Sequence, residues 1–109
     1  MATEGIEGVY VTTHNWGKTA GFFQELGYAL DFRTEDGSGM LRNGDSPYVV
    51  LVEVPDGTEL GIQLVLKAPK EVEPDVEVVT PFEDTHYGTR EMIVRDPDGR
   101  TWNLQAPRA

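Results

Sequence analysis

Two histidines and a few hydrogen-bonding side chains near the C-terminus are the groups in this sequence best suited to chemistry. His86 precedes Tyr87 in a polar loop, and an unperturbed imidazole titrates near neutral pH. His86 could therefore bind a ligand or act as a base at the rim of a cavity; the alternative is an ordinary loop residue. His14 lies between an apolar segment and a helical one. Its position is better explained by capping or surface exposure.

The last apolar segment, residues 101–105, carries different side chains on its two faces. Side chains alternate along a strand, so Trp102 and Leu104 point one way while Asn103 and Gln105 point the other. We expect Trp102 to belong to the core, with a platform for a ligand as the alternative. If the opposite face lines a cavity, Asn103 and Gln105 become hydrogen-bonding groups of a ligand pocket.

Several kinds of chemistry are excluded by the motifs that the sequence lacks. It contains no cysteine, which excludes disulfides, thiolate metal sites and a cysteine nucleophile. It has neither a G-x-S-x-G nucleophile elbow nor a G-x-x-x-x-G-K phosphate loop. Nucleophilic catalysis and nucleotide binding are therefore not expected.

One helix and eight short strands must position these side chains. The helix is expected from Trp16 to Leu26, because Asn15 suits an N-cap and Gly27 suits a left-handed residue after the helix. Apolar and β-branched runs predict the strands. They are expected at residues 6–13, 28–34, 39–43, 48–54, 60–66, 76–80, 89–95 and 101–105.

The order of these elements indicates a duplicated module. The first half runs strand, helix, strand, strand, strand, and the second half has four strands. Residues 67–75 are too few and too rich in proline for a helix, so the second module has lost its helix. Pro81 is expected to end the strand at 76–80. The uncovered apolar face would need a partner chain, which predicts a homodimer.

Length and charge limit the remaining possibilities. The 109 residues, 39% of them apolar, suit a single domain spanning residues 1–109. The formal charge of −10 argues against nucleic acid and anionic membranes as partners, because phosphate binding depends on lysine and arginine. No apolar run approaches the roughly 20 residues that span a bilayer, and the N-terminus does not resemble a signal peptide. A cytoplasmic location is expected.

Two stretches of this sequence resemble the vicinal-oxygen-chelate superfamily. The first is Val9-Tyr10-Val11 followed by a helix that ends Phe22-Phe23-Gln24-Glu25-Leu26-Gly27-Tyr28. The second is Tyr87-Gly88-Thr89-Arg90-Glu91 followed by Asp96-Pro97-Asp98-Gly99-Arg100-Thr101-Trp102-Asn103-Leu104. This superfamily includes glyoxalase, extradiol dioxygenases, fosfomycin-resistance enzymes and bleomycin-binding proteins. The resemblance implies an α+β fold, in which paired βαβββ modules form a curved mixed sheet around a cavity.

The resemblance also implies where ligands and metals would bind. The enzymes of the superfamily hold a divalent metal with histidine and glutamate. Their first ligand aligns best with Glu7, while the last falls on Asn103, a neutral amide. Glu53 and Gln63 are candidates by strand location, and any metal would be held by Glu7, Gln63 and His86. The residues expected to bind a small molecule are Glu7, Val9, Val11, Trp16, Gln63, His86, Tyr87, Trp102, Asn103 and Gln105.

Two functions of different classes follow. The first is a metal-free binding protein that sequesters a cationic or aromatic compound, such as an antibiotic, as bleomycin-resistance proteins do. The alternative is a metal-dependent lyase, isomerase or dioxygenase. Asn103 in place of a carboxylate favours the first, because divalent metals prefer carboxylate or imidazole ligands. A shortened chain whose cavity has no natural ligand is a third possibility.

Overall fold

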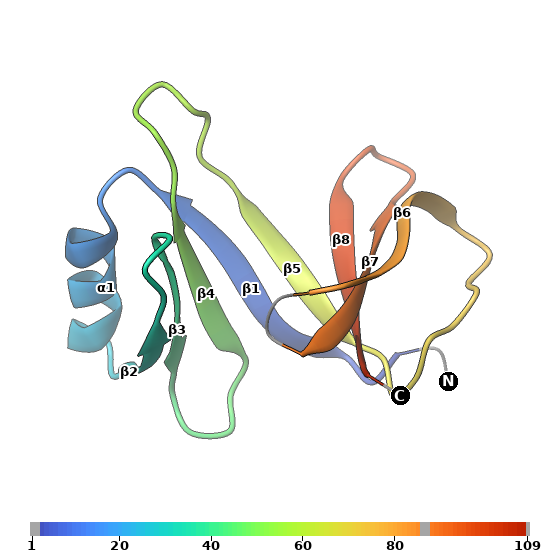
Figure 1. The fold of residues 1–109 in the computed structure, drawn as a ribbon, viewed down its shortest axis with the longest axis horizontal. Helices are drawn as coiled ribbons and strands as arrows, with labels where there is room; N and C mark the ends of the chain where they lie inside the picture. The colour runs from blue at the N-terminus through green and yellow to red at the C-terminus, as the bar shows by residue number, and fades with distance from the viewer. Residues whose placement is uncertain (1–2, 86–87, 109) are drawn as a thin grey trace. The chain divides into compact units, whose positions relative to one another are not determined.

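The computed structural model describes residues 3–85 and 88–108, which form one helix and eight strands (Figure 1). The strands divide between two compact units, each described here by itself. The N-terminal unit comprises residues 8–62, and the C-terminal unit comprises residues 63–109 together with the first seven residues. The α+β class predicted from the sequence is confirmed.

The N-terminal unit is a four-stranded mixed sheet with one helix. Its elements are β1 (Ile6–Thr13), α1 (Trp16–Glu25), β2 (Ala29–Arg33), β3 (Ser38–Arg42) and β4 (Tyr48–Glu53). The strand order is β2-β3-β4-β1, with β1 parallel to β4 and the other pairs antiparallel. The predicted first strand matches β1 at both ends, and the other elements agree within one or two residues.

The C-terminal unit repeats this arrangement without the helix. Its strands are β5 (Ile62–Lys67), β6 (Glu77–Asp84), β7 (Thr89–Arg95) and β8 (Thr101–Pro107). The order is β6-β7-β8-β5, with β5 parallel to β8 and the other pairs antiparallel. Residues 68–76 connect β5 to β6 without a helix. The predicted duplication, with a second module that lacks its helix, is therefore confirmed.

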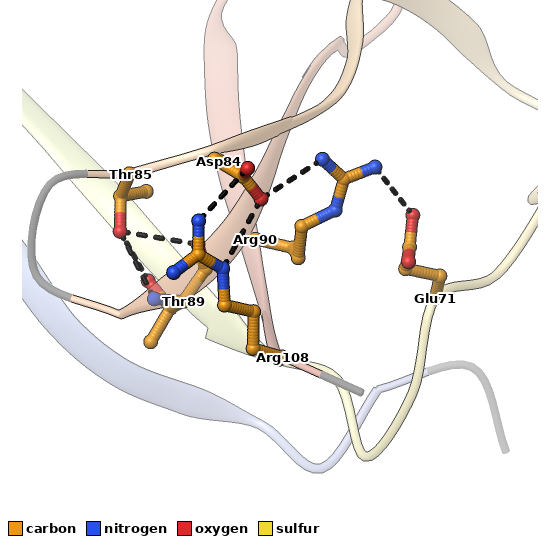
Figure 2. A network of polar contacts seen from close by, with 6 residues as sticks. All are labelled: Glu71, Asp84, Thr85, Thr89, Arg90 and Arg108. Atoms are coloured by element: carbon orange, nitrogen blue, oxygen red, sulfur yellow. Dashed lines mark hydrogen bonds and ion pairs between the residues drawn. The ribbon is translucent and has the colours of Figure 1, made fainter.

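A matching pair of hydroxyl side chains closes the same hairpin in each module. In the N-terminal unit the Thr34 and Ser38 hydroxyls lie 2.8 Å apart, and the Thr34 backbone N–H donates to the Ser38 carbonyl. In the C-terminal unit the Thr85 and Thr89 hydroxyls are also 2.8 Å apart, with the same backbone bond, as Figure 2 shows. This local repeat supports duplication at the level of individual contacts.

The helix is fixed at its start by two side-chain acceptors. Asn15 accepts the backbone N–H of Lys18, as predicted for an N-cap. The Glu53 carboxylate accepts the backbone N–H of Trp16 at 2.8 Å, where the positive end of the helix dipole favours an anion. Gly27, with a φ of +100°, follows the helix as expected.

Each unit has its own hydrophobic core. In the N-terminal unit α1 packs on the sheet through Trp16 and Ala20, which lie against Leu41, Val49 and Leu51. In the C-terminal unit the core consists of buried Met92, Val94 and Leu104, with partly buried side chains around them. Those side chains are Leu66, Val72, Phe82 and Trp102.

The prediction that Pro81 ends its strand is wrong, because β6 continues through it to Asp84. The strand lies at the edge of the sheet, where β7 is its one partner among the described strands. Its pairing is irregular between Val78 and Thr80 and again between Thr80 and Glu83. Proline cannot donate a ladder hydrogen bond, and an edge strand with irregular pairing tolerates that loss.

No helix in the described part of the chain is long and apolar enough to span a bilayer.

Candidate ligand-binding face

Strand β8 separates an apolar face of the C-terminal unit from a polar one. Leu104 belongs to the hydrophobic core, and strand alternation directs Asn103 and Gln105 to the opposite face. Both amides are nonetheless shielded from solvent, with exposures of 2% for Asn103 and 8% for Gln105. Burying polar groups costs free energy unless they are hydrogen-bonded, so their partners decide what this face can do.

Asn103 makes one hydrogen bond and leaves one atom without a partner. Its Nδ2 donates to Oε1 of Glu91 at 2.5 Å. Its Oδ1 is buried and has no hydrogen-bond partner. The amide orientation follows from chemistry, because an ionised carboxylate only accepts hydrogen bonds and must face the NH₂ group. Asn103 therefore presents an unsatisfied acceptor.

Glu91 is a site residue that the sequence analysis missed. It lies on β7 directly opposite Gln105, and Ile93 lies opposite Asn103. A signal was available, because the Asp96–Gly99 turn sets the register of the hairpin. Counting outward from that turn pairs Glu91 with Gln105 and places both on the face that carries Asn103.

A small hollow lies where this face meets the end of β8. Its volume is about 250 Å³, and Glu7, Thr89 and Gln105 are among its lining residues, with Lys67 as the one cation among them. The structure thus brings together two residues that the sequence analysis assigned to a ligand site, Glu7 and Gln105. The backbone of residues 4 and 5 is fixed there by hydrogen bonds with Lys67.

Gln63 lies on β5 and is held by a neighbouring hydroxyl. Its Nε2 donates to Oγ1 of Thr101 at 2.6 Å. This bond fixes the amide between the first and last strands of the module. Gln63 therefore contributes polarity to the C-terminal unit, and its role toward a ligand stays a prediction.

Three predicted ligand-binding residues lie in the core of the N-terminal unit instead. Trp16 is buried, and its Nε1 donates to the Leu51 carbonyl at 3.0 Å. Val9 and Val11 pack against the same cluster under α1. Val9 and Val11 therefore face the helix-covered side of the sheet, and a ligand-binding role for these three residues stays a prediction.

The remaining predictions have mixed outcomes. Trp102 packs against the second core, as expected, and its Nε1 donates to Asp96 at 3.0 Å. His14 is exposed and its Nε2 is 2.8 Å from the Thr58 carbonyl, in keeping with a surface role. His86 and Tyr87 lie outside the described residues.

The side chains of the polar face do not suit a divalent metal. Asn103, Gln105 and Gln63 are neutral amides, and the Glu91 carboxylate beside Asn103 already accepts that residue's N–H. Within the described ranges, no group of three or more histidine, aspartate or glutamate side chains could hold a metal ion. Hard and borderline cations prefer carboxylate or imidazole ligands, so this donor set is a poor match.

Comparison with known proteins finds solved structures with a similar fold. No protein-family model and no curated protein matches the chain. Among solved structures, a glyoxalase/bleomycin resistance protein/dioxygenase superfamily member from Vibrio splendidus 12B01 matches with a TM-score of 0.67 and 17% identity, over 91% of this chain and 96% of that one. The chain therefore has a fold similar to that of this structure.

A second match shows how little this fold says about activity. A protein described as an NAD-dependent benzaldehyde dehydrogenase from Legionella pneumophila matches with a TM-score of 0.65 and 13% identity, over 92% of this chain and 97% of that one. The two descriptions name different activities for one fold. Function must therefore be argued from the residues of this chain.

Proposed function

We propose that this chain is a metal-free binding protein for a small molecule that lies against the polar face of β7 and β8. The observation that carries the proposal is the buried Asn103 Oδ1, which has no hydrogen-bond partner. An unsatisfied buried acceptor costs about 1–3 kcal/mol. A ligand that donates an N–H or O–H group to this oxygen would remove that cost. The recovered free energy would increase the affinity of the protein for the ligand.

The chemistry of this face favours binding over catalysis. Its described side chains include the Asn103 and Gln105 amides and the Glu91 carboxylate, which accepts the Asn103 N–H, with Glu7 and Lys67 lining the adjoining hollow. A general base or nucleophile must be free to exchange a proton with the substrate. The amides can orient a ligand but cannot perform that step.

The charge of the chain favours a cationic or aromatic amine as the ligand. Such a molecule carries N–H donors for Asn103 Oδ1, and the formal charge of −10 raises the local concentration of cations. Sequestration of a cationic antibiotic fits this chemistry, and it requires tight binding without turnover.

Replacing Asn103 tests the proposal directly. Titration with a bleomycin-type glycopeptide and with smaller cationic aromatics, followed by tryptophan fluorescence, is expected to show saturable binding. Asn103→Leu removes the acceptor and should weaken binding about tenfold or more, the loss expected for a buried hydrogen bond. Asn43→Leu, at an exposed amide in the β3–β4 turn, is the matched control and should bind like the parent protein.

Two results would overturn the proposal. One is equal affinity of the Asn103→Leu and parent proteins, with circular dichroism showing that both are folded. The other is stoichiometric divalent metal in the purified protein, together with a rise in melting temperature when Ni²⁺, Zn²⁺, Mn²⁺ or Fe²⁺ is restored after chelation. The second result would favour the metal-dependent enzyme.

A further inference from the structure

A larger hollow lies on the apolar side of the C-terminal unit, away from the Asn103 face. Its volume is about 560 Å³, and Val72, Val78, Phe82 and Met92 form its apolar lining. Met92 belongs to the hydrophobic core, so strand alternation puts this hollow on the opposite side of β7 from Glu91.

The hollow exists because this module lacks the helix of its counterpart. In the N-terminal unit, a ten-residue helix fills the corresponding face with the buried side chains of Trp16 and Ala20. In the C-terminal unit, residues 68–76 form an irregular connection between β5 and β6 instead (Figure 1). Val72 is the residue of this segment that packs against the core. No helix of this unit packs over the second core, and the hollow lies beside Val72 of the irregular connection.

A network of ion pairs includes Glu71, one of the residues that line this hollow. Figure 2 shows Arg90 of β7 between Glu71 and Asp84, with a distance of 3.2 Å to each carboxylate. Arg108 pairs with Asp84 at 2.8 Å. These contacts link the connection between β5 and β6 to β6, β7 and Arg108 near the C-terminal end.

The charges that line this hollow are negative. Among the described residues, Glu71 and Glu73 are the charged side chains that line it, and no described lysine or arginine does so. Glu71 is paired with Arg90, whereas no ion pair involves Glu73 within the described part of the chain. An apolar pocket with an uncompensated carboxylate at its edge complements a molecule that has an apolar body and one positive charge.

We infer that this hollow is a second binding site, which takes a small amphiphilic amine with an aromatic or alkyl body. Its volume lies within the range of about 300–1,000 Å³ that is usual for small-molecule pockets. A protein partner would need about 800 Å² of surface on each side for a stable interface, which extends well beyond the lining of this hollow. The amine lies near Glu73, and the apolar body lies against Phe82 and Met92.

A matched set of probes tests the chemistry of this site. The full chain is titrated with 1-naphthylmethylamine, with the neutral 1-naphthalenemethanol and with the anionic 1-naphthylacetate, and binding is followed by ¹H–¹⁵N correlation spectra. The amine should bind most tightly and the anion most weakly. The largest shifts are expected at Val72, Val78, Phe82 and Met92.

Two pairs of variants separate the apolar and ionic contributions. Val78→Trp fills the hollow and should weaken amine binding about tenfold. Its control is Val79→Trp, at a similarly exposed neighbour that does not line the hollow, and this variant should bind the amine like the parent protein. Glu73→Gln should weaken amine binding about two- to fivefold, as expected for one exposed ionic contact, and leave the neutral probe unchanged. Glu59→Gln is its control.

Three outcomes would overturn the inference. They are equal affinity for the amine and the anion, shifts confined to β8 residues of the polar face, and concentration-dependent dimerisation that Val78→Trp abolishes. The last would show that a second copy of the chain occupies this face. Asn103→Leu should leave amine binding here intact, so failure at this site is distinguishable from failure of the proposed function.

Discussion

At the scale of single residues, Asp96 organises the final hairpin. Its carboxylate accepts hydrogen bonds from Trp102 Nε1 at 3.0 Å and Arg100 Nε at 2.8 Å. It also accepts the backbone N–H groups of Asp98 and Arg100. These donors stabilise the charged form, with the Trp102 and Arg100 side chains contributing most, and they hold the pKa of Asp96 well below its usual value of 3.8. The turn that sets the register of Asn103 therefore depends on an ionised Asp96.

The pKa of Asp96 predicts a loss of stability in acid. Because its pKa is lowered by folding, its contribution is fully present above about pH 3.8 and is lost as the pH falls from there toward the folded-state pKa. Asp96→Asn should lower the melting temperature at neutral pH and flatten its fall in acid. Thermal unfolding between about pH 2 and pH 7 measures both effects. Asp56→Asn lies in an exposed turn and should show the same dependence of melting temperature on pH as the parent protein. If the melting temperature of Asp96→Asn falls as steeply in acid as that of the parent, this role of Asp96 is contradicted.

At the scale of elements, the glycines next to the first core have opposite roles. Gly39 on β3 lets the Trp16 ring approach closely, because a Cβ there would lie 2.7 Å from Trp16 Cζ2 and from the Phe32 carbonyl oxygen. Gly21 lies inside α1, where a Cβ would meet nothing within 4 Å. One glycine is required by packing, and the other only weakens the helix.

Alanine substitution should therefore change stability in opposite directions at these two positions. Gly21→Ala is expected to raise the free energy of unfolding by about 0.5–1 kcal/mol, because glycine in a helix interior costs that much. Gly39→Ala should lower it by about 1–3 kcal/mol, because the added methyl group overpacks the core against Trp16. Urea unfolding followed by circular dichroism measures both changes. A stabilised Gly39→Ala protein would show that this close approach has no energetic role.

At the scale of the whole molecule, the excess of acidic residues affects every ligand. With 19 acidic and 9 basic residues, the chain repels anions and attracts cations at long range. The ion pairs of Arg90 beside the larger hollow involve partly exposed side chains, so salt screens them as well. Affinity for cationic ligands should therefore depend on ionic strength.

Salt titration tests this long-range attraction. Raising sodium chloride from about 20 mM to about 0.5 M shortens the Debye length severalfold and should weaken binding of 1-naphthylmethylamine by several-fold. The neutral 1-naphthalenemethanol should bind equally well or slightly better in high salt. Calorimetric titrations at matched temperature give both affinities. An amine affinity that is insensitive to salt would show that charge has no part in recognition.

The sequence by itself determined the local structure of this protein. Strand alternation, the Asn15 cap and the Asp96–Gly99 turn depend on neighbouring residues, so the elements, the duplication and the missing helix could all be predicted. The two faces of β8 were also predictable, because alternation requires only the sequence. Glu91 could have been found by the same counting of register.

The tertiary structure decided which side chains meet. The alternation of side chains along β1 does not indicate which face of the sheet the helix covers. Val9 and Val11 were therefore expected to line a cavity, whereas they pack against the cluster under α1. The extension of β6 through Pro81 depended on its place at the sheet edge. The larger hollow lies beside the second core, where an irregular connection stands in place of the helix. These features arise from contacts between distant segments, and sequence periodicity carries no information about such contacts.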